Sequence, residues 1–319
     1  MEDRTFSRRD VIRLAAGAVI WPQAATRTSL IATPVRFGVI ADVHHGLGTR
    51  TEERLADFLE KASRRPLDFI VQMGDFNHPE PEAVGFLKLW QSHKGPRYGV
   101  IGNHDMDKGS KPQAVENWRI PGRHYSFDSG FLHFVVLDAN FMKLDGKLVP
   151  YEKGNWYRSG ITSSWIDPEQ LDWLRADLSQ AKKPTLIFVH QGIDETQGGG
   201  AVPNRAEVRK ILEDSGKIVA CLMGHHHVDT DETRNGIYYW RVNSASYAWV
   251  GENYGRMAPY DRSLHAFVTI WADGRMEVEG RRSIFEGDSP FARGVPNPDL
   301  FSSSIISRAE HLMISRVSG

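Results

Sequence analysis

Five short clusters of acidic, histidine and amide side chains each follow an apolar, β-branched run of this chain. The clusters are Asp42 with His44, Gly74-Asp75, Gly102-Asn103-His104-Asp105, His190 and Gly224-His225-His226-His227. Short apolar runs bounded by polar residues predict buried strands. In open α/β sheets, residues that follow strand ends gather at the edge where ligands bind. The pattern therefore predicts an α/β fold in which strand ends deliver all the clusters to one rim.

The residue types in the clusters favour a pair of metal ions. Carboxylate oxygens and imidazole nitrogens together bind Mn, Fe or Zn, and one shared carboxylate can hold two ions close together. A lone ion needs fewer donors. His225 and His227 are two residues apart, so in an extended segment their rings point to one side and His226 to the other. We therefore expect His225 and His227 to be ligands, and His226 not to be one.

In their order, the clusters resemble the motifs of the calcineurin-like metallophosphoesterases, D-x-H, G-D, G-N-H-[DE], H and G-H-x-H. The resemblance spans roughly Val35 to Ile284. It implies two metal sites that share Asp75 as a bridge. The first would be formed by Asp42, His44, Asp75 and His227, and the second by Asp75, Asn103, His190 and His225.

The same resemblance implies the chemistry of two further residues. His104 would be a non-ligand general acid close to the substrate, and Asp105 would orient it. The chain departs from the family pattern after G-D, where many members carry a carboxylate or a fixed polar residue and this chain reads Phe76-Asn77-His78. An isolated buried Asp or His is more often a hydrogen-bonded structural residue than a ligand. The ordered set of motifs, taken together, argues against that alternative.

Local patterns along the chain agree with the four-layer αββα sandwich of two mixed β-sheets flanked by helices that the resemblance implies. Strand and helix alternate in most of the chain. A proline at the first helical position after Asp167 marks another helix start. We expect strands over 35–41, 69–73, 98–101, 125–128, 132–137, 185–189 and 218–223, helices over 51–64, 82–92 and 205–214, a β-meander over 237–243, 265–271 and 276–280, and a short helix over 307–315.

Two segments read as irregular loops, Asn140–Trp165 and Tyr247–Tyr260. Both are rich in aromatic residues and glycine. Long loops in a compact domain are often binding loops. The alternative is that the aromatic side chains only pack the loops onto the body. Our candidates for substrate contacts are Asn103, His104, Tyr247 and Tyr254.

The first residues predict export. Ser7-Arg8-Arg9 precedes a short apolar stretch, Leu14–Trp21, and the arrangement resembles a twin-arginine signal. The stretch is too short to span a bilayer. A frayed amphipathic helix is the alternative. We expect a signal and linker over 1–33, a metallophosphoesterase domain over 34–290 and a C-terminal tail over 291–319, with the twin-arginine export machinery as a partner and a periplasmic or extracellular location.

Charge and cysteine content limit the other partners. The net charge of -1 gives no electrostatic reason to expect nucleic-acid polymers or anionic membranes, and no stable membrane span is expected. The single cysteine, Cys221, cannot form an internal disulfide.

The leading functional hypothesis is a dinuclear metal-dependent hydrolase. A metal-bridging hydroxide would attack phosphorus while His104 protonates the leaving group. Small-molecule phosphodiesters or nucleotide-type compounds are the favoured substrates, because aromatic walls can stack a base or cover an apolar ester group. A phosphomonoesterase or 5′-nucleotidase is the alternative enzyme. A non-catalytic, metal-stabilised binding module is the alternative from another class.

Overall fold

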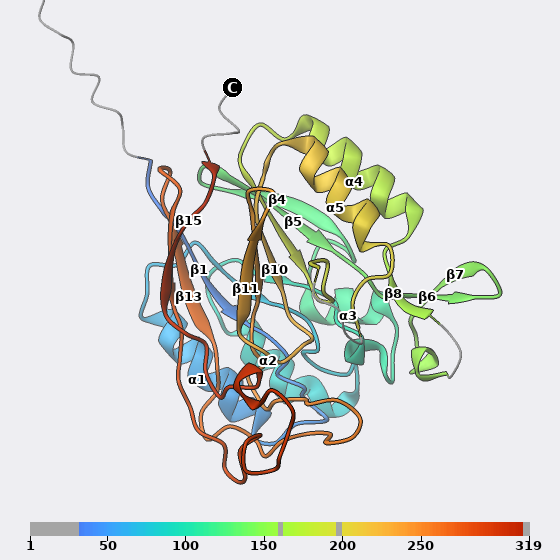
Figure 1. Ribbon diagram of the computed structural model, residues 1–319, viewed down its shortest axis with the longest axis vertical. Coiled ribbons are helices and arrows are strands. Elements are labelled where there is room, and N and C mark those ends of the chain that lie inside the picture. Colours follow the sequence, from blue (N-terminus) through green and yellow to red (C-terminus); the bar gives the residue numbers. More distant parts are fainter. Residues whose placement is uncertain (1–31, 159–161, 196–199, 315–319) are drawn as a thin grey trace, which may run out of the picture. The chain divides into compact units, whose positions relative to one another are not determined.

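Two mixed β-sheets of six strands each pack face to face, with helices on their outer faces (Figure 1). The computed structural model describes residues 32–158, 162–195 and 200–314. The expected four-layer αββα sandwich is therefore confirmed. The expected export signal lies outside the described residues, apart from 32 and 33.

The first sheet has the strand order β15-β14-β13-β1-β2-β3. Its three N-terminal strands run parallel to one another, and its three C-terminal strands are antiparallel neighbours. The bounds are β1 Val35–Ile40, β2 Phe69–Gln72, β3 Arg97–Gly99, β13 Ala266–Ile270, β14 Arg275–Glu279 and β15 Arg308–His311.

The second sheet has the order β11-β12-β10-β9-β5-β4. Its four central strands are parallel, and an antiparallel strand lies at each edge. The bounds are β4 Tyr125–Ser129, β5 Leu132–Leu137, β9 Thr185–Val189, β10 Ile218–Met223, β11 Thr230–Arg234 and β12 Ile237–Arg241.

Alternating side chains on the strands build the central and outer layers. In β9, Phe188 points to the first sheet, where its ring lies 5.9 Å from that of Phe37. Its neighbour Ile187 packs in a second cluster with Leu174 and Leu212 of the helices on the outer face. Because both faces of the parallel strands are buried, their sequences read as continuous apolar runs.

Helices cover the two outer faces. Helix α1 (Thr51–Ser63) buries Leu55, Phe58 and Leu59 at helical spacing against the first sheet. Helix α2 (Val84–Gln91) lies beside α1. Helices α4 (Pro168–Gln180) and α5 (Arg205–Ser215) cover the second sheet (Figure 1). No helix in the described part of the chain is both long and apolar enough to cross a membrane. The remaining bounds are α3 Lys111–Trp118 and the 3-10 turns η1 Pro81–Ala83, η2 His104–Met106, η3 Asn155–Tyr157 and η4 Pro298–Leu300.

The segment Asn140–Trp165 is not the irregular loop that we expected. It contains a third sheet in the order β7-β6-β8, formed by β6 Phe141–Leu144, β7 Lys147–Pro150 and β8 Thr162–Trp165. Strands β6 and β7 are joined by an Asp145-Gly146 turn, and the hairpin extends outward from the two main sheets (Figure 1). Asp-Gly between alternating residues is a strong hairpin signal, and Asp145-Gly146 is that signal in this segment.

Two further expectations are wrong. The segment 307–315 is not a helix, because 308–311 forms β15 and pairs with β14. The β-meander is divided between the sheets. Strand β12 pairs in parallel with β10 in the second sheet, whereas β13 and β14 form an antiparallel pair in the first. Local patterns predict that a strand exists but not its distant partner.

Candidate metal centre

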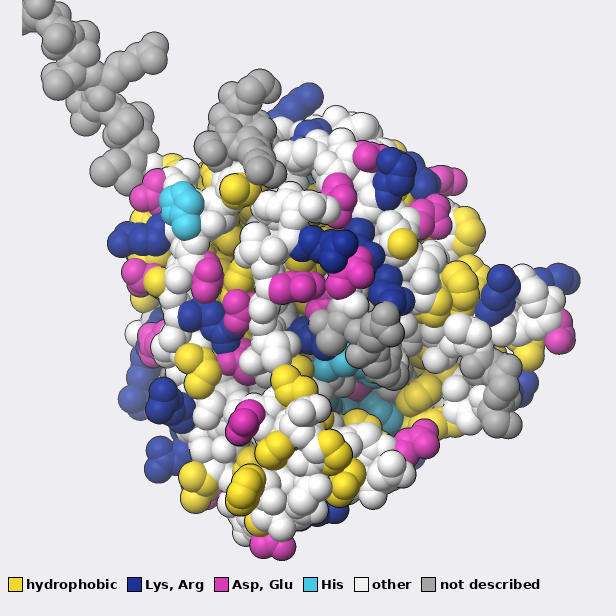
Figure 2. Space-filling model, viewed as in Figure 1, with side chains coloured by type: hydrophobic (Ala, Val, Ile, Leu, Met, Phe, Trp, Pro, Cys, Tyr) yellow, Lys and Arg dark blue, Asp and Glu magenta, His cyan; other side chains and the backbone are white. Residues whose placement is uncertain are grey.

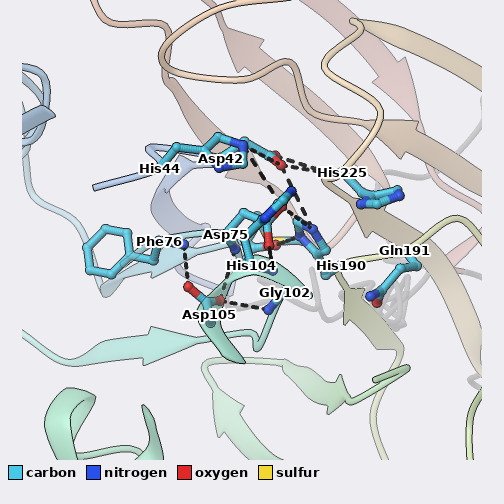
Figure 3. A network of polar contacts seen from close by, with 12 residues as sticks. Asp42, His44, Asp75, Phe76, Gly102, His104, Asp105, His190, Gln191 and His225 are labelled. Atoms are coloured by element: carbon cyan, nitrogen blue, oxygen red, sulfur yellow. Dashed lines mark hydrogen bonds and ion pairs between the residues drawn. The ribbon is translucent and has the colours of Figure 1, made fainter. Parts of the chain in front are cut away.

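Five parallel strands from both sheets end around one site. The residues after β1, β2 and β3 come from the first sheet, and those after β9 and β10 come from the second. Figure 3 shows the side chains of Asp75 and His190 meeting at this site, and histidine side chains are visible in the middle of the molecular face in Figure 2. The candidates that the structure brings together are Asp42, His44, Asp75, Asn103, His104, His190, His225 and His227.

The backbone at most of these ligand candidates is left-handed. Asp42, His44, Asp75, His225 and His227 all have φ between 49° and 67°. Asp and His tolerate this conformation better than most residues, but it still costs free energy and is common at functional sites. The positive φ turns consecutive side chains sharply at the strand ends. His225 and His227 therefore reach the site through a left-handed backbone, not through the extended segment that we expected.

Two motif glycines are required by close approach. A Cβ atom on Gly102 would overlap the backbone nitrogen and carboxylate of Asp75. Gly74 has φ +97°, and a Cβ atom there would overlap the ring of His190. A side chain at either position would push a ligand candidate away. The glycines of the G-D and G-N-H-D motifs thus allow the strand ends to pack closely.

The first expected metal set forms a tight group. Nε2 of His44 lies 3.0 Å from Nε2 of His227, and these two atoms lie 3.9 and 3.3 Å from Oδ1 of Asp42. Oδ2 of Asp75 lies 3.9 Å from Nε2 of His44. These side chains are at most 4% exposed. Two carboxylates and two imidazoles therefore direct ligand atoms at one small volume.

The second expected set shares Asp75 with the first. Oδ2 of Asp75 lies 3.2 Å from Nε2 of His190, and Asp75, His190 and His225 form a second cluster suited to a metal ion. Asn103 lies in the adjoining loop and is 3% exposed. Asp75 thus lies between the two groups, as the bridging role requires.

Unpaired atoms in the second set fit a cation. Oδ1 of Asn103, Nε2 of His190 and Nδ1 of His225 are buried, and none makes a hydrogen bond of good geometry among the described residues, although Nε2 of His190 contacts the Asp75 carboxylate. A buried polar atom without a partner is costly. All three atoms are good ligands for borderline divalent metals. The donor chemistry of the site therefore fits a dinuclear centre, and it does not distinguish Mn, Fe and Zn.

Hydrogen bonds behind the imidazoles fix which nitrogen faces the site. Nδ1 of His190 donates to the carbonyl of Met73 at 2.7 Å, and Nδ1 of His227 donates to the carbonyl of Tyr247 at 2.8 Å. Each bond leaves Nε2 available as a ligand atom. Backbone carbonyls commonly orient metal-binding histidines in this way.

The charge balance of the site also favours cations. Burial, together with neighbouring imidazoles, lowers the pKa of His44 and of His225 well below the usual value, so both stay in the neutral form that binds metals. Burial opposes protonation of His190, but the carboxylates of Asp75 and Asp42 raise its pKa to about 9. The two carboxylates thus place negative charge next to the imidazole nitrogens, and this charge favours a cation at the site.

His104 lies beside the ligand candidates, with a ring nitrogen within 4.8 Å of ligand atoms of His44 and Asp75, but it is more exposed than those two residues. Its backbone N–H donates to Oδ1 of Asp75 at 2.8 Å, and its side chain is 26% exposed. Nδ1 of His104 lies 2.8 Å from Oδ2 of Asp107. Burial lowers the pKa of His104, but Asp75 and Asp107 outweigh it, so the pKa is raised. A protonated imidazole at the exposed rim suits a general acid.

The carboxylate that orients His104 is Asp107, and the expectation for Asp105 is wrong. Asp105 is fully buried and accepts hydrogen bonds from the backbone N–H groups of Gly102, Asp75, Phe76 and Asn77. It therefore ties two motif loops together from behind (Figure 3). In η2, the residue three positions after His104 returns to the same side. The spacing of three positions between His104 and Asp107 is the signal in the sequence for this pairing.

Of the two candidate aromatic contacts, one lies at the site. The ring of Tyr247 stacks on His44, with centroids 5.1 Å apart. Tyr254 instead donates from its hydroxyl to the carbonyl of Gly294 in the C-terminal segment at 3.2 Å. Tyr247 therefore lies beside the metal centre, whereas Tyr254 makes a packing contact.

Three further histidines beside the motif residues have other surroundings. His45 lies 2.8 Å from the hydroxyl of Thr51 through Nδ1, and its ring stacks on Phe86. His78 lies 3.5 Å from Asp107. His226 is largely buried and lies near Gly192, outside the metal-binding groups.

Comparison with known proteins agrees with this geometry. Residues 35–229 match the calcineurin-like phosphoesterase family. A dimetal phosphatase from Danio rerio has a similar structure, with 17% identity, a TM-score of 0.59, and coverage of 79% of this chain and 99% of that one. GAP50, the anchor in the inner membrane complex of Plasmodium, gives 14% identity, a TM-score of 0.52, and coverage of 83% and 96%. No curated protein sequence matches the chain. At these identities the structural likeness concerns the fold.

Proposed function

The chain belongs to the calcineurin-like phosphoesterase family, and from that premise we propose that it hydrolyses small organic phosphodiesters or nucleotide-type phosphoesters at a dinuclear metal centre. The family assignment carries the general activity, which is phosphoester hydrolysis. The choice of substrate is our own proposal. It rests on the side chains around the metal centre.

The observation that carries the proposal is the shared position of Asp75 between two groups of buried ligand atoms. Asp42, His44 and His227 would hold one ion with Asp75. Asn103, His190 and His225 would hold the other. When bound, two ions supply an activated water molecule and neutralise charge on the phosphoryl oxygens.

The surrounding residues supply the remaining steps. His104 keeps a proton at the exposed rim and donates it to the departing oxygen. Tyr247 stacks on His44 and fixes one side of the site. Arg256 lies over the Tyr247 ring, with its guanidinium carbon 4.3 Å from the ring centroid. Tyr247 itself is only 5% exposed, so the aromatic surface open to an apolar or planar ester group is that of Tyr157, which is 58% exposed and lies beside His104.

A pair of synthetic esters tests the proposal. The metal-loaded protein should hydrolyse bis-nitrophenyl phosphate faster than nitrophenyl phosphate. The reverse ratio would indicate a monoesterase and contradict the proposed diester preference. If the protein binds two metal ions per chain but hydrolyses neither ester, the result would contradict the proposed hydrolysis and favour a binding module.

We also propose that the protein is exported by the twin-arginine route to the periplasm or the extracellular space. The proposal rests on Arg8-Arg9 before the apolar stretch Leu14–Trp21. This route carries folded proteins, so a metal centre assembled in the cytoplasm would be kept.

A further inference from the structure

Three donors converge on the carboxylate of Asp107. Nδ1 of His104 and the hydroxyl of Tyr157 lie 2.8 and 2.9 Å from Oδ2, and Nε1 of Trp156 lies 3.2 Å from Oδ1. The Tyr157 hydroxyl also lies 2.9 Å from Nδ1 of His104. The side chain of Asp107 is only 10% exposed. Asp107 is therefore the centre of a small, mostly buried network.

The network fixes the proton positions. An ionised carboxylate only accepts hydrogen bonds, so Nδ1 of His104, the Tyr157 hydroxyl and the Trp156 indole all carry the hydrogens. Burial opposes ionisation of Asp107, but the hydrogen bond from His104 and the nearby imidazole of His78 outweigh it and lower its pKa. Burial and the Asp107 charge raise the pKa of Tyr157, so its hydroxyl stays protonated. Nε2 of His104 takes no part in these bonds and would be the nitrogen that donates to the leaving group.

The two aromatic residues come from η3, in the segment that carries the third sheet. This segment is held to the loop that bears His104 by backbone hydrogen bonds. Lys153 N–H donates to the Gly109 carbonyl at 2.7 Å, and Gly154 N–H donates to the Met106 carbonyl at 2.9 Å. Residues 152–157 thus follow residues 104–110 closely, although they lie about fifty positions later.

Tyr157 also presents a surface to substrate. Its ring stacks on Trp156 with centroids 3.9 Å apart, and Trp156 meets the His104 ring edge-on at 5.2 Å. Tyr157 is nevertheless 58% exposed. An exposed aromatic ring held rigid by its hydroxyl next to the general acid is suited to contact the organic part of a leaving group.

We propose that Tyr157 has two roles in the proposed hydrolysis, on which this inference rests. Its hydroxyl positions His104 through Asp107, and its ring contacts the leaving group. The substrates would then be phosphoesters whose leaving alcohol carries a flat or apolar group. Tyr157 is a positioning residue through its hydroxyl and a specificity residue through its ring.

Two substitutions separate the roles. Tyr157→Phe keeps the ring and removes the hydroxyl, so kcat for an alkyl ester should fall about tenfold with KM unchanged. Loss on a nitrophenyl ester should be much smaller, because nitrophenolate scarcely needs a proton. Tyr157→Leu should in addition raise KM for esters with an aryl leaving group, but not for a methyl ester. Tyr254→Phe is the matched control, since its hydroxyl bonds to Gly294, and it should keep wild-type rates.

A double-mutant cycle tests whether Tyr157 acts through His104. In a His104→Ala background, Tyr157→Phe should cost nothing further on the alkyl ester, with metal content unchanged throughout. An additive loss, an equal loss on both esters or a wild-type rate for Tyr157→Phe would overturn the positioning role. An unchanged aryl KM in Tyr157→Leu would overturn the specificity role. Inactivity of the metal-loaded wild type would instead overturn the proposed function.

Discussion

The carboxylate of Asp75 lies 3.2 Å from the imidazole of His190, although the two residues follow strands of different sheets. Asp75 comes after β2 in the first sheet, and His190 comes after β9 in the second. A cation bound between them would tie the two halves of the sandwich together. Metal binding and the stability of the fold should therefore be linked.

Removing the metal ions should lower the melting temperature. A ligand that binds only the folded state at a hundred times its Kd adds about 2.7 kcal/mol to the free energy of unfolding. Calorimetry before and after chelation measures the shift, and added metal should reverse it. Asp75→Ala is the control and should respond less to the chelator. An equal Tm with and without metal would contradict the link between the sheets.

Loss of the bridging residue should remove more metal than loss of a ligand to one ion. Asp75→Ala affects both groups of ligand atoms, whereas Asn103→Ala affects one. Elemental analysis should find fewer ions per chain in the Asp75 variant. Full dinuclear occupancy in that variant would rule out the shared position of Asp75.

His104→Ala should affect esters according to their leaving groups. General acid catalysis typically contributes about 10²–10⁴-fold, and it matters most for a basic alkoxide. The variant should keep its metal content, lose most activity toward alkyl phosphoesters and lose less toward nitrophenyl esters. Rate constants for the two esters, measured with metal content, decide the matter. Equal losses would exclude the acid role and suggest stabilisation of transition-state charge.

Replacing Arg8 and Arg9 with lysine should trap folded, metal-loaded enzyme inside the cell. The twin-arginine pair is the recognised part of such a signal, and lysine keeps the charge. Cell fractionation with an activity assay measures the distribution. Undiminished export would show that the arginine pair is not the signal.

His133 should make stability depend on pH away from the metal centre. Nδ1 lies 2.6 Å from Asp128 and Nε2 lies 3.0 Å from Asp177. Burial lowers the pKa of His133, but Asp177 and Asp128 outweigh it and raise the pKa above its usual value. The stabilisation is therefore fully present below the unfolded pKa of about 6.5 and is lost as the pH rises through the folded pKa.

His133→Gln should accordingly cost more stability at pH 6 than at pH 9, by about 1 kcal/mol. Urea unfolding at the two pH values measures the difference, and His311→Gln, at an exposed position, is the control. A cost that is independent of pH would mean that His133 is not charged in the folded protein.

The metal-ligand candidates could be predicted because they follow strands with a simple apolar pattern. The ends of β1, β2, β9 and β10 lie within one residue of the ends predicted from the apolar runs. The order of the motifs that follow these strands indicated the family. The local backbone could not be predicted. The left-handed turns at His225 and His227 result from packing against distant residues, such as the bond from the His225 N–H to Asp42.

The residues that serve His104 were missed for a related reason. Asp105 and Asp107 are both close to His104 in sequence, and only the 3-10 turn decides which faces it. Tyr157 reaches the site through contacts across about fifty residues, which no local pattern reveals. Likewise β15 is a short, polar strand whose order depends on pairing with β14.

The left-handed backbone at Asp42, His44, Asp75, His225 and His227 affects how such a site would decay in evolution. Strain at each position costs of order 1 kcal/mol, and glycine would relieve it. In a lineage that no longer needs the activity, selection for stability alone would favour glycine there, followed by asparagine, over alanine. Inactive descendants of this chain should therefore carry glycine at former ligand positions. The positions of those glycines would then indicate where the backbone of the ancestral site had a positive φ.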